Sequence, residues 1–274
     1  MNLTVLLDMA ADGFGDRVLI GRRADGLTAN GLRQAAHRGA GLVKEASADA
    51  IVYVAANGPA LPVALFAAAH AGVPLVPLNF RLGAEQLEGL LAKHPGALAV
   101  ADVATHAVLA RQGVQAVTPE QWLSSTTETG HWEGELVESD APAVVIYTSG
   151  TTSAPKGVLL RHANLTSYVL GTVEFGVAEP EEAALVSVPP YHIAAVANVI
   201  TNLYAGRRVI VLERFEPTEW LETVRLEDVT SALVVPTMLA RIVDCAADKK
   251  VPTLRNLAYG GAPMPCLRSR ACGR

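Results

Sequence analysis

The feature that most constrains the fold of this chain is a pair of long segments without any charged side chain. No Lys, Arg, Asp or Glu occurs in the 31 residues from 50 to 80 or in the 24 residues from 183 to 206. Each segment is long enough for a transmembrane helix, which needs about 20 apolar residues. Both are interrupted, however, by Asn57-Gly58-Pro59 and Gly72-Val73-Pro74 in the first and by Pro189-Pro190 in the second. The pattern therefore predicts buried strands and helices of a globular core, and no membrane span.

The pieces between these breaks alternate in type. Ile51–Val54 is β-branched and aromatic, Leu61–Ala71 is rich in Ala and Leu, and Leu75–Leu78 is a short extended piece, which predicts strand, helix and strand. Both strands are continuously apolar, as in a parallel sheet that is covered on two faces. The alternation continues along the chain and predicts an α/β fold with mostly parallel sheets flanked by helices.

The remaining elements follow from the same patterns. Further strands are expected at 97–101, 115–117, 144–147, 158–160, 184–188, 208–212, 231–235 and 256–259. Helices are expected from the Thr28 N-cap to about Glu45 and at 83–93, 104–111, 164–175, 192–204, 217–226 and 236–247. The polar segment 124–142, with its Ser/Thr runs and glycines, is the best candidate for a subdomain linker.

Charge and cysteine content exclude several classes of protein. The chain has 22 Lys and Arg against 27 Asp and Glu, so no basic excess indicates a nucleic-acid partner. Three cysteines, an odd number, argue against a disulfide framework and favour a reducing, cytoplasmic compartment. The N-terminal segment carries Asp8 and no basic residue before its apolar run, so it does not have the pattern of a signal peptide.

One segment carries the elements of a phosphate-binding loop. A predicted buried strand ends in Thr148-Ser149-Gly150-Thr151-Thr152, and Lys156 follows before the next predicted strand. Small residues let backbone N–H groups approach an anion, the hydroxyls add donors, and the lysine adds charge. The spacing is not that of a Walker A loop, because Pro155 and Gly157 stand at two of its fixed positions. A hairpin turn that binds no ligand remains the alternative.

The segment from Tyr147 to Val158 resembles the phosphate-loop signature of the adenylate-forming superfamily, with Ser153 where the family usually has glycine. This superfamily contains acyl-CoA synthetases, luciferases and the adenylation domains of peptide synthetases. Flanking segments resemble the family in the same order, and they are Pro77-Leu78-Asn79-Phe80-Arg81-Leu82, His162-Ala163-Asn164-Leu165, Pro189-Pro190-Tyr191-His192 and Tyr259-Gly260-Gly261-Ala262-Pro263-Met264. The resemblance thus extends over nearly the whole chain, and it implies that residues 1–264 form part of the AMP-binding N-terminal domain of such an enzyme.

The resemblance also implies a reaction and a set of site residues. Family members join a small carboxylic acid to ATP with Mg²⁺, release pyrophosphate and usually pass the acyl group to coenzyme A, as acyl-CoA synthetases of fatty acid metabolism do. The residues that would hold the β- and γ-phosphates are Thr148, Ser149, Gly150, Thr151, Thr152 and Lys156. The residues that would line the adenine and acyl pocket are Gly260, Gly261 and Ala262, where a side chain would obstruct the ligand.

His192 is the histidine with a functional context, because it follows Pro-Pro-Tyr in the family's order and would lie beside the acyl carboxylate or the α-phosphate. A capping or packing role is the alternative. Amino-acid-activating members have an aspartate at this position, so the resemblance implies a fatty, aryl or other acid without an α-amine. The other histidines (37, 70, 94, 106, 131 and 162) have no such context, and His37 and His94 are expected at exposed helix positions.

Three later elements of the family pattern have no counterpart in this sequence. They are the acidic magnesium residue, the aspartate that holds the ribose, and the lid that carries a lysine. The segment 265–274 is instead Arg- and Cys-rich. A frameshifted or early-ended reading frame is our hypothesis for it, and a variable tail of the family is the alternative. Two functions therefore stay open: an AMP-forming acid–CoA ligase, or a catalytically incomplete remnant that only binds ATP or acyl groups or is inactive. A truncated parallel sheet would also expose apolar surface, which predicts poor solubility or self-association.

Overall fold

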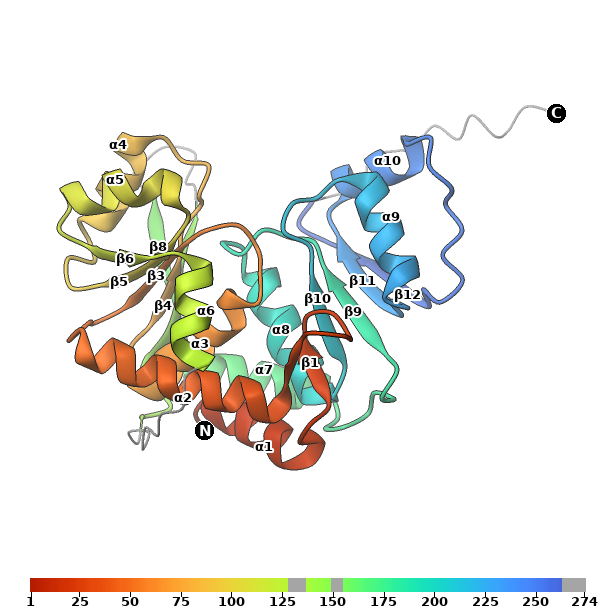
Figure 1. Cartoon of the computed structure of the whole chain (residues 1–274), viewed down its shortest axis with the longest axis horizontal. Coiled ribbons are helices and arrows are strands. Elements are labelled where there is room, and N and C mark those ends of the chain that lie inside the picture. The colour runs from red at the N-terminus through yellow and green to blue at the C-terminus, as the bar shows by residue number, and fades with distance from the viewer. Residues whose placement is uncertain (128–136, 149–154, 263–274) are drawn as a thin grey trace.

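A computed structural model describes residues 1–127, 137–148 and 155–262 of the chain. Its described strands form two sheets, each of six strands, which lie side by side in Figure 1 with helices between them and outside them. This arrangement confirms the predicted α/β fold with mostly parallel sheets flanked by helices. It also confirms the parallel strand–helix–strand unit predicted from the first uncharged segment.

The first sheet is parallel except at one edge, where β7 and β8 run antiparallel. Its strands, in spatial order, are β6 (Gln115–Val117), β5 (Leu98–Ala101), β3 (Ile51–Val54), β4 (Leu75–Pro77), β7 (Pro142–Thr148) and β8 (Lys156–Arg161).

The second sheet is parallel except at the edge formed by β1 and β2. Its strands, in spatial order, are β12 (Asn256–Tyr259), β11 (Ser231–Val234), β9 (Ala183–Val186), β10 (Arg208–Val211), β1 (Val18–Ile20) and β2 (Leu27–Thr28).

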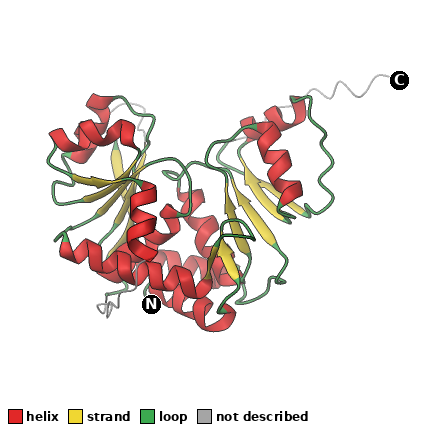
Figure 2. Ribbon diagram, in the orientation of Figure 1, coloured by secondary structure: helices red, strands yellow, loops and turns green. Residues whose placement is uncertain are grey.

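The helices cover the faces of both sheets (Figure 2). In chain order, the helices are α1 (Thr4–Phe14), α2 (Ala29–Glu45), α3 (Ala60–Ala71), α4 (Ala84–Leu91), α5 (Val103–Arg111), α6 (Pro119–Thr127), α7 (His162–Thr172), α8 (Ile193–Ala205), α9 (Pro217–Leu226) and α10 (Pro236–Asp244).

The apolar side chains form a central cluster between the sheets and an outer cluster beyond each sheet. In β3, Ile51 and Tyr53 belong to the central cluster, whereas Val52 and Val54 belong to the outer cluster that includes residues of α4 and α5. Successive side chains of a strand point to opposite faces, so a strand that is covered on both faces is apolar throughout. On its far side the second sheet has its own cluster with α9 and α10.

Helix α3 explains the first uncharged segment. All of its residues are buried, as expected of a helix that is hydrophobic on every side and lies inside a protein. It packs closely on α2, where a Cβ added to Gly39 would lie 2.7 Å from the Cβ of Ala67. A charged side chain has no place on such a helix. In the described part of the chain, no helix is both long and apolar enough to cross a bilayer.

Most predicted elements lie within a few residues of their observed bounds, including α2 with its Thr28 cap. The hydroxyl Oγ1 of Thr28 accepts a hydrogen bond of 3.0 Å from the Gly31 N–H, which satisfies one free donor of the first turn. The sequence did not predict α1, β1, β2 or α6. The segment 124–142, expected as a subdomain linker, begins inside α6, and its residues 128–136 lie outside the described residues. The segment leads to β7 in the first sheet. The chain passes from one sheet to the other at α2 and at α7.

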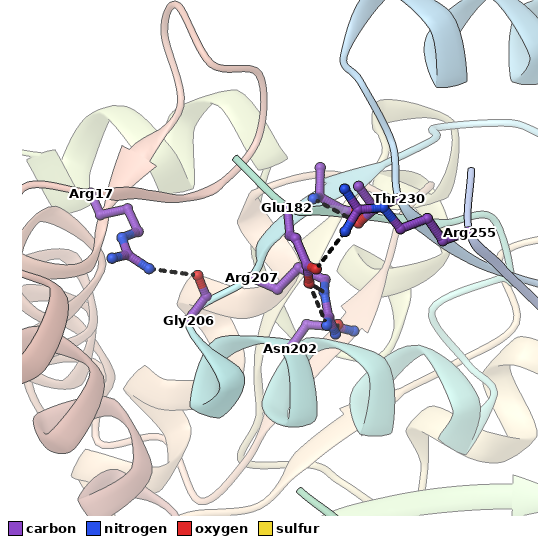
Figure 3. A network of polar contacts seen from close by, with 8 residues as sticks. Arg17, Glu182, Asn202, Gly206, Arg207, Thr230 and Arg255 are labelled. Carbon is purple, nitrogen blue, oxygen red and sulfur yellow. Dashed lines mark hydrogen bonds and ion pairs between the residues drawn. The ribbon is translucent and has the colours of Figure 1, made fainter. Parts of the chain in front are cut away.

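A polar network joins the amino ends of four strands of the second sheet (Figure 3). The carboxylate of Glu182, just before β9, accepts hydrogen bonds of 2.9 and 2.7 Å from the guanidinium of Arg207, just before β10. Arg255, just before β12, adds a longer contact of 3.5 Å to the same carboxylate. Thr230, just before β11, donates its hydroxyl to the Ala183 carbonyl at 3.0 Å. The network fixes the edge of the sheet that lies opposite the carboxyl ends of its strands.

Candidate active site

The carboxyl ends of the parallel strands of both sheets meet in one region. The side-chain amide of Asn57, which follows β3, donates a hydrogen bond of 2.7 Å to the carbonyl of Val188, which follows β9. The rings of Phe80, which follows β4, and Tyr191 lie 5.9 Å apart, edge to face. In open α/β sheets, ligands bind outside the carboxyl ends where the strand order reverses. The reversals here lie between β3 and β4 and between β9 and β10.

A hollow of about 210 Å³ lies at both reversal points. Its lining residues are Asn57, Phe80, Arg81, Ser187, Pro189, Pro190, Glu213, Arg214, Phe215, Thr237, Met238 and Arg241. Aromatic and proline side chains give it apolar walls, and three arginines against one glutamate make it attractive to an anion. A larger hollow of about 610 Å³ beside the β1–β2 hairpin is lined by Glu213, Glu219 and Glu227, and these carboxylates oppose a phosphate.

Two buried polar atoms in the smaller hollow point to a ligand. Asn57 is 6% exposed and Ser187 is 3% exposed. Neither the Asn57 Oδ1 atom nor the Ser187 hydroxyl has a hydrogen-bond partner among the described residues. Buried polar groups are usually satisfied, so such atoms at the wall of a pocket are candidates for contact with a bound molecule. The sequence pattern alone predicts only a break after a strand at Asn57. The position of Asn57 after a buried parallel strand is the signal that could have identified it.

The predicted phosphate loop has described residues at its two ends. Thr148 ends β7 and Lys156 begins β8, and these two residues are paired across the ladder. The Thr148 hydroxyl donates a hydrogen bond of 3.5 Å to the Lys156 carbonyl, and both residues are exposed. Ser149, Gly150, Thr151 and Thr152 lie outside the described residues. The structure thus presents the hydroxyl and the lysine together at the carboxyl edge of the first sheet.

Lys93 and His94 lie beside this strand end, although the sequence analysis gave them no role. The Lys93 ammonium donates to the Pro155 carbonyl at 3.3 Å and lies 5.1 Å from the centre of the Tyr147 ring. The Nε2 atom of His94 is 2.9 Å from the Tyr147 hydroxyl. Burial raises the pKa of Tyr147 and lowers that of His94. This contact joins residues 53 positions apart in the chain, so spacing could not predict it.

The expectation that His37 and His94 are exposed is wrong. Both are half-buried, because His94 packs on Tyr147 and the ring of His37 lies 4.3 Å from that of His70. His162 is fully buried, and its Nδ1 atom accepts a hydrogen bond of 3.2 Å from the Leu3 N–H. This contact ties the N-terminal segment to α7.

His192 lies at the carboxyl edge of the second sheet. It is the N-cap residue of α8, and its backbone N–H donates to the Pro189 carbonyl at 3.1 Å. Its ring lies 4.8 Å from that of Tyr191, and its side chain makes no capping hydrogen bond. Partial burial lowers the pKa of His192 below the usual value of 6.5. The imidazole is therefore neutral near pH 7 and can accept or donate a hydrogen bond.

The predicted glycine-rich turn follows β12 at the same edge. The Gly260 N–H donates to the Val234 carbonyl at 3.2 Å, which continues the β11–β12 pairing. Gly261 has φ +85°, a left-handed conformation that favours glycine. Among the described residues, a Cβ added to Gly260 would meet no atom within 4 Å. Gly260 is half-buried, and Ala262 beside the turn is exposed.

Comparisons with known proteins agree with the sequence motifs. Residues 7–269 match the family model described as "AMP-binding enzyme". The chain is 36% identical over 256 residues to a feruloyl-CoA synthase of an Amycolatopsis species, which covers 90% of this chain and 49% of that protein. It is 27% identical to an indoleacetate–CoA ligase of Aromatoleum aromaticum, with 82% of this chain and 44% of that protein covered. The chain thus spans about half the length of the curated relatives it matches.

Solved structures share the fold. The N-terminal domain of FACL13 from Mycobacterium tuberculosis superposes with a TM-score of 0.84 at 22% identity, covering 96% of this chain and 71% of that one. O-succinylbenzoate coenzyme A synthetase from Bacillus subtilis, in complex with AMP, gives a TM-score of 0.80 at 23% identity, covering 94% of this chain and 68% of that one. At these identities the likeness concerns the fold alone.

Proposed function

The chain belongs to the AMP-binding enzyme family, and from this premise we propose that it is the ATP- and acyl-binding part of an AMP-forming acid–CoA ligase. In the proposed reaction a carboxylate oxygen attacks the α-phosphorus of ATP, and pyrophosphate leaves. The thiol of coenzyme A then attacks the acyl carbon and displaces AMP. The observation that supports the proposal is that Thr148, Lys156, His192 and Gly260 each lie at or beside the carboxyl end of a strand in one of the two sheets.

We assign the leaving pyrophosphate to the β7–β8 end. Lys156 is exposed, so its ammonium group can approach the β- and γ-phosphates as a point charge. The Thr148 hydroxyl can turn from the Lys156 carbonyl, to which its bond of 3.5 Å is weak, toward a phosphate oxygen. Ser149, Gly150, Thr151 and Thr152 complete the proposed cradle. Such a clamp stabilises charge that develops on the leaving group.

We assign the acid and the adenosine to the second sheet. Neutral His192 would hydrogen-bond the acyl carboxylate or the α-phosphate, and Gly260, Gly261 and Ala262 would leave room for the adenine and the acyl group. The hollow at Phe80, Ser187 and Phe215, with arginines at its wall, suits an acyl or thiol substrate that carries an anionic group. The names of the feruloyl- and indoleacetate-activating relatives favour an aryl acid without an α-amine.

Mg²⁺ and coenzyme A complete the proposed set of ligands. Mg²⁺ would neutralise the phosphates, and none of this chain's residues is assigned to it, because the acidic residue that the family resemblance calls for has no match in the sequence. The odd cysteine count supports a reducing, cytoplasmic setting for the protein. We propose the complete ligation reaction for a protein of the relatives' length, which is about twice the length of this chain.

The second candidate function is binding of ATP and acyl groups without turnover. It applies to this 274-residue chain taken alone, in which no segment resembles the ribose aspartate, the magnesium residue or the lid lysine. Acid-dependent exchange of pyrophosphate into ATP separates the two functions. We expect very little exchange by this 274-residue chain, and robust exchange that Lys156→Ala abolishes would contradict that expectation.

Binding of an unreactive acyl-adenylate analogue tests the proposed site independently of turnover. We expect a feruloyl-adenylate analogue to bind at least about tenfold more tightly than a phenylalanyl-adenylate analogue, because an unpaired ammonium is costly in this pocket. Equal affinity for the two analogues would rule out the assignment of an acid without an α-amine. No binding of either analogue would rule out the acyl-binding role as a whole.

A further inference from the structure

Three helices place a carboxylate and two imidazoles together, outside the proposed active site. Asp8 comes from α1, His37 from α2 and His70 from α3. One ligand atom of each residue lies within 4.8 Å of the other two. The two imidazole rings meet edge to face, with their centres 4.3 Å apart. No part of the proposed ligase reaction uses these residues.

His70 is buried to a degree that is unusual for a histidine. It is 6% exposed on a helix whose other residues are apolar or small, and its Nε2 atom has no hydrogen-bond partner among the described residues. Leaving such a buried nitrogen unsatisfied has a free-energy cost, because the nitrogen loses its hydrogen bonds to water when the chain folds. A bound cation with an open coordination position would remove this cost, because a neutral imidazole nitrogen is a good metal ligand.

We propose that Asp8, His37 and His70 form a binding site for a divalent transition metal such as Zn²⁺. Imidazole together with one carboxylate suits Zn²⁺, Fe²⁺, Co²⁺ or Ni²⁺, whereas Mg²⁺ and Ca²⁺ prefer oxygen ligands alone. Two His and one carboxylate are also the ligand set of open three-residue zinc sites. The ion would be separate from the Mg²⁺ that accompanies ATP.

The distances between the three ligand atoms allow a metal ion to bind after a small movement of the side chains. An ion at the centre of a triangle with sides of 4.8 Å lies about 2.8 Å from each corner, against about 2.0–2.2 Å in a zinc site. Each ligand atom must therefore close by less than about 1 Å. Asp8 and His37 are half-buried, so their side chains can adjust and leave the solvent side open for a water ligand. Arg33, the nearby cation, forms its own ion pair with Asp12 at 2.7 Å.

Binding would clamp α1, α2 and α3 together. These helices contribute much of the central cluster between the sheets. Because the site needs all three helices in place, the ion binds the folded chain in preference to the unfolded one, and it stabilises the fold by mass action. The inferred role is structural and does not depend on ATP or on the acid.

Co²⁺ is the most direct probe, because its visible absorption reports coordination by the protein. We expect the full chain to take up about one Co²⁺, to lose it to Zn²⁺, and to unfold at a higher temperature with either ion, whereas Mg²⁺ has no such effect. Mutation of a residue that only supports a metal ligand weakens metal binding by about 10- to 100-fold. Asp8→Asn and His37→Gln remove the ligands themselves, so each should weaken Co²⁺ binding by more than that. Both positions are half-buried, so both variants are expected to fold.

Asp16→Asn is the matched control, because Asp16 follows α1 in the chain, is exposed and is not among the grouped ligands. It should leave the Co²⁺ affinity unchanged. The three cysteines could also bind Co²⁺, so the titration is repeated after alkylation. Equal affinity in the wild-type chain and in both ligand variants, uptake that alkylation abolishes, or no uptake at all would each overturn the proposal.

Discussion

Thr148 and Lys156 face each other across the last rung of the β7–β8 ladder, with the Thr148 hydroxyl 3.5 Å from the Lys156 carbonyl. The described residues Thr148 and Lys156 thus lie together at one point of the sheet edge. A hydroxyl and a lysine residue are brought to the carboxyl end of β7, which runs parallel to β4. This is the location at which α/β sheets bind their ligands.

Two substitutions in the glycine-rich turn test its backbone conformation and its place in the proposed binding pocket. Gly261→Ala should lower the free energy of unfolding by about 1–2 kcal/mol, because alanine is strained at φ +85°. Gly260→Ala should leave the free energy of unfolding unchanged, since the added Cβ meets no atom of the described residues within 4 Å. Urea unfolding measures both. The same Gly260→Ala chain should bind the acyl-adenylate analogue more weakly, and unchanged binding would remove Gly260 from the proposed pocket.

Acid should destabilise the fold through two buried histidines. Burial lowers the pKa of both His70 and His162 from 6.5 to about 4. Between these values the unfolded chain binds protons that the folded chain does not, so stability is lost as the pH falls from about 6.5 to about 4. The loss is at most about 3 kcal/mol for each histidine.

Unfolding curves at a series of pH values test this account. His162→Gln should reduce the pH dependence within that window, since it removes one of the two groups. Thr166→Ser, a change at another buried position of α7 that removes no titratable group, should leave the pH dependence as it is. If the free energy of unfolding of the His162→Gln chain falls with pH as steeply as that of the wild type, His162 contributes nothing to acid unfolding.

The Glu182 network should contribute more to stability than the ion pairs at the surface. Glu182→Gln replaces a charged acceptor of two hydrogen bonds from Arg207, whose side chain is 22% exposed. We expect a loss of about 1–3 kcal/mol. Glu45→Gln, which breaks the exposed pair with Arg38, should cost under about 1 kcal/mol. Similar losses in the two variants would contradict this ranking.

The edge strand β12 is the predicted surface for self-association. All four of its residues are exposed, among them Leu257 and Tyr259, and its outer edge is unpaired in the described part of the chain. Exposed apolar edge strands promote pairing between chains. Sedimentation at several concentrations should reveal oligomers that Leu257→Lys reduces. A single monomeric species at all concentrations would contradict the prediction.

Local patterns predicted much of this fold because its strands are buried on both faces and its helices are punctuated by Gly and Pro. β3, α3 and β4 follow directly from one uncharged segment. By contrast, α6 buries little besides Trp122 and Thr126, so its sequence carries no apolar period, and β1 and β2 have only three and two residues. Such elements form because the rest of the protein packs on them.

The candidate site was predictable where a motif is continuous in the chain. Thr148, Lys156, His192 and Gly260 were named from such motifs, and the structure places each at the carboxyl end of a strand or beside it. The hollow lined by Asn57 and Ser187 joins strands of both sheets, and the contact of His94 with Tyr147 spans distant segments. Contacts of this kind depend on tertiary packing, which periodicity does not encode.

Titration of the chain with ATP and Mg²⁺ tests the central claim most directly. The account predicts saturable binding that Lys156→Ala weakens by about 10- to 100-fold, the value of a hydrogen bond between charged groups. Lys250→Ala, which removes another exposed lysine between α10 and β12, should bind ATP as the wild type does. Equal affinity in the wild-type and Lys156→Ala chains, or no binding of ATP at all, would contradict the assignment of the β7–β8 end as the phosphate site.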